Sequence, residues 1–160
     1  GAFGMTKELS ARISDSLHLE HIDVGGVGGT LAGNALSMAA VRATLTEVLT
    51  EEAFARMEQL CTIWTKDVQD IIDEYQIPWQ VSQLGCRAEY SFRATAPRTG
   101  KEAADADDFE LQQYLHLHAL NRGILMTPFH NMALISPATT LEDVKRHTEH
   151  FKDAAKALFT

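Results

Sequence analysis

The sequence is poor in cysteine and has no long apolar run. Its two cysteines, Cys61 and Cys86, form no C-x-x-C pair and are too few for a disulfide framework, so we expect a protein of the reducing cytoplasm. No apolar run approaches the roughly 20 residues that a membrane-spanning helix needs. The G-x-S-x-G and H-E-x-x-H motifs of hydrolases and zinc proteases are also absent, which argues against those two chemistries.

Positive charge is scarce as well. The chain has 14 Lys and Arg against 22 Asp and Glu, and its formal net charge of −8 argues against nucleic acid as the main partner. With 160 residues, of which 45% are hydrophobic, it can bury a substantial core as one domain or as part of a larger one.

Glycine is concentrated in one stretch. Five of the ten glycines lie between Gly25 and Gly33, and an apolar helical run over 35–49 follows at once. Glycine-rich backbone before a helix N-terminus forms a cradle for an anion such as phosphate, and Thr30 adds a hydroxyl there. The spacing matches neither the dinucleotide fingerprint nor a Walker A loop, so a flexible loop without a ligand is an equal alternative on pattern alone.

The rest of the chain predicts a compact α+β unit that follows a short N-terminal helix. The expected elements, in order, are helices over 6–13 and 51–75, a half-buried strand over 81–92, a polar loop over 94–106, a helix over 107–122, short strands over 124–127 and 132–136, and a final helix capped by Thr140. The helical spacing predicts two inward stripes, one of Phe54, Met57, Cys61, Trp64, Val68, Ile71 and Tyr75, and one of Val144, Phe151, Ala155 and Leu158.

The histidines do not predict a metal site. His116 and His118 are two apart on a helix and point in different directions, so we expect one to be packed and the other exposed. His147 and His150 share a helix face with charged neighbours, and we expect that face to be solvated.

Two arginines, Arg87 and Arg93, lie on the polar face of the strand predicted over 81–92. Either arginine could clamp a substrate carboxylate with two hydrogen bonds. A solvated strand face is the simpler interpretation of both, because arginines are mostly exposed.

One segment resembles a known family. The string Gly-Gly-Thr-Leu-Ala-Gly-Asn-Ala-Leu-Ser-Met-Ala-Ala, Gly28–Ala40, resembles the G-T-x-x-G-N-P-x-x-x-A-A segment of class III aminotransferases. These are pyridoxal-phosphate enzymes of fold type I, and the resemblance is greatest to their glutamate-1-semialdehyde aminomutase subgroup. Gly1–Gly4 is similar to the end of the family block that follows the Schiff-base lysine. Asn121–Thr127 and Leu134–Val144 are similar to the family's C-terminal strand and helix.

The resemblance implies an α/β fold, namely the C-terminal part of a fold type I transferase dependent on pyridoxal 5'-phosphate. Residues 1–49 would end the large cofactor-binding domain and start a linker helix, and residues 50–160 would form the small C-terminal α+β domain. The implied activity is amino transfer between an amino acid or amine and a keto acid, in a homodimer with shared active sites. The catalytic lysine would lie upstream of Gly1, so no catalytic residue is expected in this chain.

Carried over by motif, the resemblance places the cofactor phosphate of the neighbouring subunit on Thr30 and the Gly29 backbone. It leaves the substrate carboxylate to Arg87 or to an upstream arginine, because residues 132–137 contain none. Ala35 stands where the family commonly has proline, a mild change at a helix start.

Two alternatives remain open. The first is an aminomutase that moves the amino group within one substrate, as in the glutamate-1-semialdehyde 2,1-aminomutases. The second, from another class, is a non-catalytic C-terminal binding or assembly module. The strand-like start at Gly1 argues against the second alternative.

Overall fold

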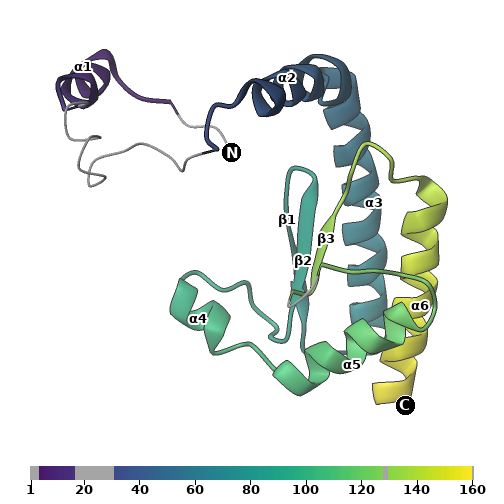
Figure 1. The fold of residues 1–160 in the computed structure, drawn as a ribbon. Helices are drawn as coiled ribbons and strands as arrows, with labels where there is room; N and C mark the ends of the chain where they lie inside the picture. Colours follow the sequence, from purple (N-terminus) through teal and green to yellow (C-terminus); the bar gives the residue numbers. More distant parts are fainter. Residues whose placement is uncertain (1–3, 17–30, 128–129, 160) are drawn as a thin grey trace. The chain divides into compact units, whose positions relative to one another are not determined.

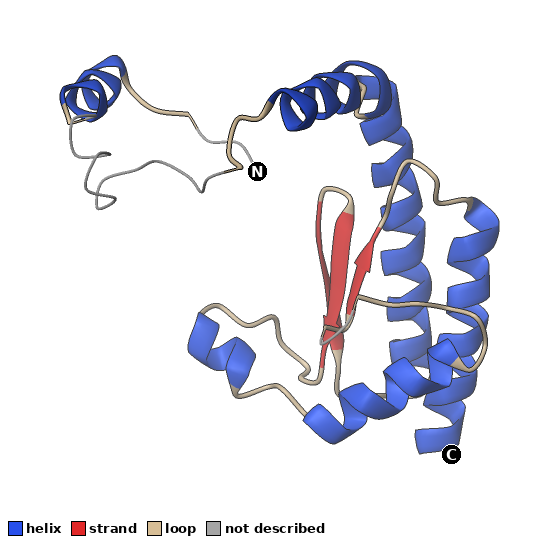
Figure 2. Cartoon of the chain, in the orientation of Figure 1, coloured by secondary structure: helices blue, strands red, loops and turns tan. Residues whose placement is uncertain are grey.

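The computed structural model describes residues 4–16, 31–127 and 130–159 (Figures 1 and 2). Its elements, in chain order, are α1 (Lys7–Asp15), α2 (Ala35–Ala43), the π-helical segment η2 (Thr44–Val48), α3 (Glu51–Glu74), β1 (Gln80–Leu84), β2 (Arg87–Ser91), α4 (Gly100–Ala104), α5 (Phe109–Leu120), β3 (Met132–Leu134) and α6 (Leu141–Phe159). The chain divides into two compact units, Gly1–Thr44 and Leu45–Thr160.

The described part of the first unit contains two helices with side-chain caps. Thr6 caps α1 by accepting a hydrogen bond from the backbone N–H of Leu9 at 3.2 Å, which confirms the predicted start of that helix. Asn34 caps α2 in the same way, and its Oδ1 accepts the N–H of Ser37 at 3.0 Å. The helix predicted over 35–49 is confirmed as α2 followed by η2.

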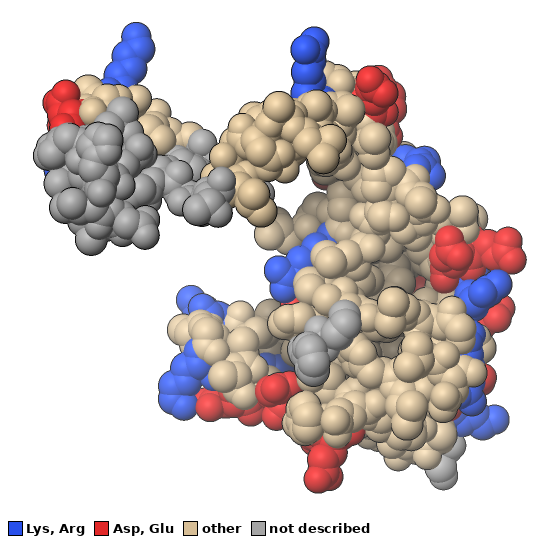
Figure 3. Space-filling model, in the orientation of Figure 1, with Lys and Arg blue, Asp and Glu red and all other residues tan. Residues whose placement is uncertain are grey.

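Helix α2 exposes most of its apolar surface. None of its residues is buried, and Leu36 is 81% exposed. Charged side chains are sparse over this helix (Figure 3). A helix of this composition is normally covered by other protein, because its apolar side chains gain free energy when they leave water.

The second unit is built on a three-stranded antiparallel sheet in the order β1-β2-β3. The prediction of a single strand over 81–92 is wrong. Gly85 and Cys86 turn the chain, so this segment forms the antiparallel hairpin of β1 and β2. Gly85 has φ of +58°, a conformation that glycine adopts without strain. The predicted alternation holds on β2, where Ala88 and Tyr90 are buried and Arg87 is exposed.

Two other expectations are wrong. Residues 124–127 form no strand, so β3 pairs only with β2. The polar loop predicted over 94–106 contains the short helix α4, whose N-terminus is capped by Thr99. A five-residue helix has too few periodic apolar positions to be seen in a sequence, which explains the omission of α4.

Helices α3 and α6 cover one face of the sheet, and α5 packs against α6 (Figures 1 and 2). The predicted stripe of α3 is confirmed from Met57 to Ile71, whereas Phe54 is 44% exposed. On α6 the predicted residues Val144, Phe151 and Ala155 are buried, but Leu158 is exposed. The stripes fail only toward the helix ends, where the packed elements no longer reach them.

Helix α3 ends before Pro78 for a reason in its own backbone. Gln76 adopts φ of +54°, and the N–H of Ile77 bonds to the carbonyl of Ile72 at 2.9 Å while the N–H of Gln76 bonds to that of Asp73 at 3.2 Å. This pair of bonds is the Schellman motif, which satisfies two carbonyls at the helix end. Ile77 is then buried against the core.

The core contains one polar contact that the sequence did not predict. Trp64 of α3 donates its indole N–H to Nδ1 of His147 on α6 at 2.9 Å, and both side chains are buried. The expected solvated face for His147 is therefore wrong. His147 lies three residues after Val144 and four before Phe151, so it belongs to the inward stripe by position despite its polarity.

This environment keeps His147 neutral. Burial, together with a smaller effect of the nearby His150, lowers the pKa of the imidazole to about 4. The indole N–H reinforces the effect because it donates to the lone pair that a proton would take.

We expect this pair to make the fold sensitive to acid. The pKa of His147 is near 6.5 in the unfolded chain and about 4 in the folded one. Its neutral form therefore stabilises the fold fully above pH 6.5, and the free energy of unfolding falls by about 3 kcal/mol as the pH drops from 6.5 to 4. Urea unfolding of the protein at pH 7 and pH 4.5 measures this loss. His147→Gln is the control, because an amide oxygen can accept the indole N–H and does not titrate. Equal pH dependence in both proteins would contradict the assignment.

No helix among the described residues is long and apolar enough to cross a membrane.

Candidate functional site

The predicted phosphate residues, Gly29 and Thr30, lie outside the described residues, so the phosphate cradle stays a prediction. The neighbouring backbone is described. Gly33 has φ of +69°, and α2 begins two residues later behind its Asn34 cap. A helix N-terminus, with its unpaired N–H groups, therefore lies directly after the glycine-rich stretch.

Arg87, the predicted carboxylate-binding residue, lies on the outer face of the sheet. Its guanidinium contacts Glu89, with Nη2 to Oε2 at 2.8 Å, and 51% of its side chain is exposed. Its guanidinium is thus accessible from solvent and is oriented by one carboxylate of the same strand. The other predicted arginine, Arg93, is used differently.

Arg93 joins β2 to the segment that carries α4. Its guanidinium donates to the backbone carbonyl of Glu102 and to Oγ1 of Thr95, both at 3.2 Å. Both bonds hold the connection between β2 and α5 in place. The structure therefore separates two arginines that the sequence could not distinguish.

Glu89 connects Arg87 to a histidine that the sequence did not single out. Oε1 of Glu89 lies 3.9 Å from Nδ1 of His130, which precedes β3. The backbone carbonyl of His130 lies 2.7 Å from Nε2 of His116 on α5. The three charged or titratable side chains Arg87, Glu89 and His130 thus form one row on the open face of the sheet.

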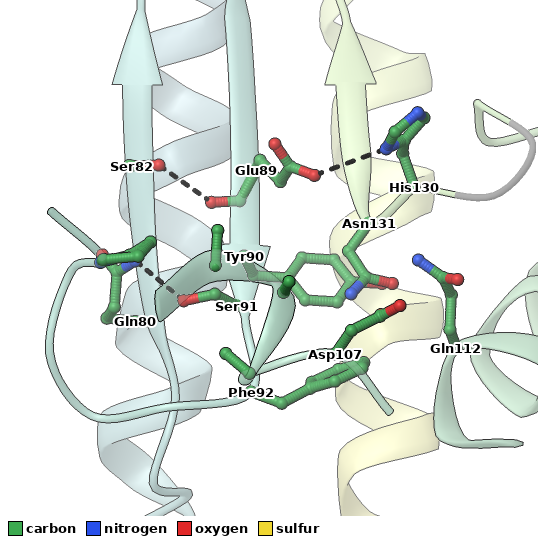
Figure 4. Close-up of a pocket in the computed structure, with 14 residues that line it drawn as sticks. Gln80, Ser82, Glu89, Tyr90, Ser91, Phe92, Asp107, Gln112, His130 and Asn131 are labelled. Atoms are coloured by element: carbon green, nitrogen blue, oxygen red, sulfur yellow. Dashed lines mark hydrogen bonds and ion pairs between the residues drawn. The ribbon is translucent and has the colours of Figure 1, made fainter. Parts of the chain in front are cut away.

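A cavity of about 300 Å³ opens beside this row (Figure 4). It lies between the ends of β1 and β2, helices α4 and α5, and the residues before β3. The polar side chains of Asn131, Gln112 and Asp107 turn toward one another across it, and Tyr90 and Phe92 form its apolar wall. Asn131 is only 6% exposed, and its Oδ1 has no hydrogen-bond partner among the described residues.

The described residues contain no group of three or more His, Cys, Asp or Glu arranged to hold a metal ion. His116 and His118 are both half-buried, so the expectation that one is packed and the other exposed is wrong. Partial burial lowers the pKa of His118, and the nearby Arg122 adds to this effect. Cys61 and Cys86 are both free thiols.

Comparison with curated proteins finds glutamate-1-semialdehyde 2,1-aminomutases among the relatives, although no protein-family model matches the chain. Glutamate-1-semialdehyde 2,1-aminomutase 2 of Brevibacillus brevis is 28% identical over 161 residues, which is 99% of this chain and 36% of that protein. The chain spans about a third of the length of the curated relatives it matches.

Two solved structures of a glutamate-1-semialdehyde-aminomutase from Pseudomonas aeruginosa PAO1 are more similar. One is 44% identical with a TM-score of 0.88, covering 97% of this chain and 35% of its own. The other, a complex with PMP, is 48% identical with a TM-score of 0.81, covering 84% of this chain and 30% of its own. The chain matches the C-terminal part of class III pyridoxal-phosphate enzymes. The predicted family and its α/β fold of type I are confirmed.

The fold is also similar to that of an aminotransferase. A β-phenylalanine aminotransferase from Variovorax paradoxus has a TM-score of 0.70 at 24% identity, covering 88% of this chain and 33% of its own. At that identity the likeness concerns the fold alone.

Sequence reasoning missed the residues of the cavity. Asn131, Gln112 and His130 belong to no motif, and they come together only through the pairing of β3 with β2 and the packing of α5. The one local sign of these cavity residues in the sequence was the polar pair His130-Asn131 directly before an apolar strand.

Proposed function

We propose that this chain is the C-terminal portion of a pyridoxal-phosphate-dependent enzyme that transfers an amino group between an amino acid or amine and a keto acid. The observation that carries the proposal is the match to the P. aeruginosa aminomutase, at 44% identity over 97% of this chain. Residues 1–49 are assigned to the end of the cofactor-binding domain and the start of the linker helix, and residues 50–160 to the C-terminal domain. The change of unit at Thr44 supports this division.

The cofactor phosphate is assigned to Thr30 and the Gly29 backbone. Support comes from the start of α2 at Ala35, because a helix N-terminus after a glycine-rich segment favours a phosphate. When bound, pyridoxal phosphate supplies the electron sink that amino transfer requires. The lysine that holds it is assigned to the part of the enzyme upstream of Gly1, in keeping with the greater length of the relatives.

The substrate carboxylate is assigned to Arg87. An exposed guanidinium that already contacts one carboxylate, Glu89, has the geometry to bind another.

We further propose a cytoplasmic homodimer in which Thr30 and Gly29 serve the active site of the neighbouring subunit. The free state of both cysteines supports the reducing compartment.

A second candidate is a 2,1-aminomutase, which returns the amino group to the same carbon skeleton. It is favoured by the names of the similar proteins, since the B. brevis and P. aeruginosa relatives are both aminomutases. A non-catalytic binding module, the rival from another class, has no counterpart among these relatives.

Loss of the Thr30 hydroxyl should weaken cofactor retention. A charge-assisted hydrogen bond to phosphate contributes about 2 kcal/mol, so Thr30→Ala in the complete enzyme should raise the cofactor Kd by about tenfold to thirtyfold. Equilibrium dialysis with absorbance detection measures the Kd. Ser10→Ala, in the exposed α1, is the control and should leave the Kd unchanged. An unchanged Kd in Thr30→Ala would remove this residue from the site.

The fate of the amino nitrogen tests the activity itself. We expect the complete enzyme, given glutamate 1-semialdehyde with a ¹⁵N amino group and an unlabelled keto acid, to produce a ¹⁵N-labelled amino acid from the keto acid. Mass spectrometry of the products measures the transfer. If the label stays on a rearranged isomer of the substrate, and no keto acid is needed, the aminomutase is correct. If the label does not move at all, both enzymes are contradicted and the binding module is favoured.

A further inference from the structure

The cavity beside β2 presents hydrogen-bond acceptors and negative charge. Its fourteen lining residues include two carboxylates, Glu89 and Asp107, and neither Lys nor Arg is among them. The carboxylate of Glu89 is shared with Arg87, which lies outside the lining, and with His130. Asp107 is therefore the carboxylate in the lining that is available to bind a cationic ligand.

The amide of Asn131 supplies the second acceptor. Its side chain is more than nine-tenths buried, and Oδ1 has no partner among the described residues although it lies in a cavity wall. A buried acceptor without a hydrogen bond destabilises the fold, so native proteins retain one where a ligand or water completes it. Figure 4 shows this amide turned toward Asp107 and toward Gln112 of α5, which is also buried.

The apolar wall suits a cation as well. Phe92 lines the same space and is half-buried, whereas Tyr90, which also lines it, is 3% exposed and stacks on Trp64 and Trp79. An aromatic ring attracts ammonium and guanidinium groups through its quadrupole, so Phe92 is the ring available to a cation. A volume of about 300 Å³ is at the small end of the range for ligand pockets, so the occupant has few heavy atoms.

We propose that this cavity binds a small organic cation with several N–H donors, held by Asn131 Oδ1 and the Asp107 carboxylate beside Phe92. Arg87 does not line this cavity. The proposal does not depend on amino transfer.

Binding of methylguanidinium to the complete protein tests the proposal. This probe is planar, carries five N–H donors and does not compete for the aldehyde of a pyridoxal cofactor as a primary amine would. We expect calorimetric titration to give a Kd of about 1 mM that weakens with added salt. Methylurea, which has nearly the same shape but no charge, should bind at least tenfold more weakly.

Variants separate the cavity from the rest of the surface. Asn131→Leu should weaken methylguanidinium binding at least tenfold. Asp107→Asn should do the same at an exposed position, where loss of folding is not a concern. Gln113→Leu is the matched control, because Gln113 neighbours Gln112 on α5 but does not line the cavity, and it should leave the Kd unchanged.

Three results would overturn the proposal. They are no binding of methylguanidinium, equal affinity for methylurea, or a Kd that Asp107→Asn leaves unchanged; in each case water alone would complete Asn131. The titration measures cation binding and not amino transfer. A negative result would therefore contradict the cation site alone and leave the proposed amino transfer untouched.

Discussion

The C-terminal unit depends on one seam, where Trp64 of α3 meets Tyr90 of the sheet and His147 of α6. The Trp64 ring centre lies 6.3 Å from that of Tyr90 and 5.1 Å from that of His147. Burial of these large rings supplies much of the driving force for packing, and the indole hydrogen bond sets their orientation. Three elements that are distant in the sequence are thus fixed by one contact.

That seam decides which side of the sheet is open. Because side chains alternate along β2, the burial of Ala88 and Tyr90 forces Arg87 and Glu89 to the opposite face. The row of Arg87, Glu89 and His130 is therefore a consequence of core packing. The cavity arises at the end of the same sheet, where α4 and α5 continue past the last paired residues.

The sequence predicted the parts of the fold that depend on local patterns. Helices were expected to start at residues 6 and 51 and after Thr140, and Thr6, Thr50 and Thr140 each accept the capping bond there. The inward stripes of α3 and α6 were correct over their central turns. These features could be predicted because helix caps and helical periodicity are encoded within a few neighbouring residues.

The errors arose where distant residues decide the outcome. The turn at Gly85 was hidden in a run that continued to alternate, and the burial of His147 depends on the indole N–H of Trp64, 83 residues away in the sequence. The cavity around Asn131 needed the pairing of β3 with β2. The family resemblance, by contrast, was carried by short local strings, above all Gly28–Ala40, and the match to the aminomutases confirms it.

The central proposal is that the catalytic lysine belongs to a segment upstream of Gly1 and not to residues 1–160. The most direct measurement is borohydride reduction of the complete protein with bound cofactor, followed by peptide mapping with mass spectrometry. The account predicts one pyridoxyl-phosphate adduct on a lysine upstream of Gly1. An adduct on a lysine of this chain, such as Lys66 or Lys152, or no adduct at all, would contradict it.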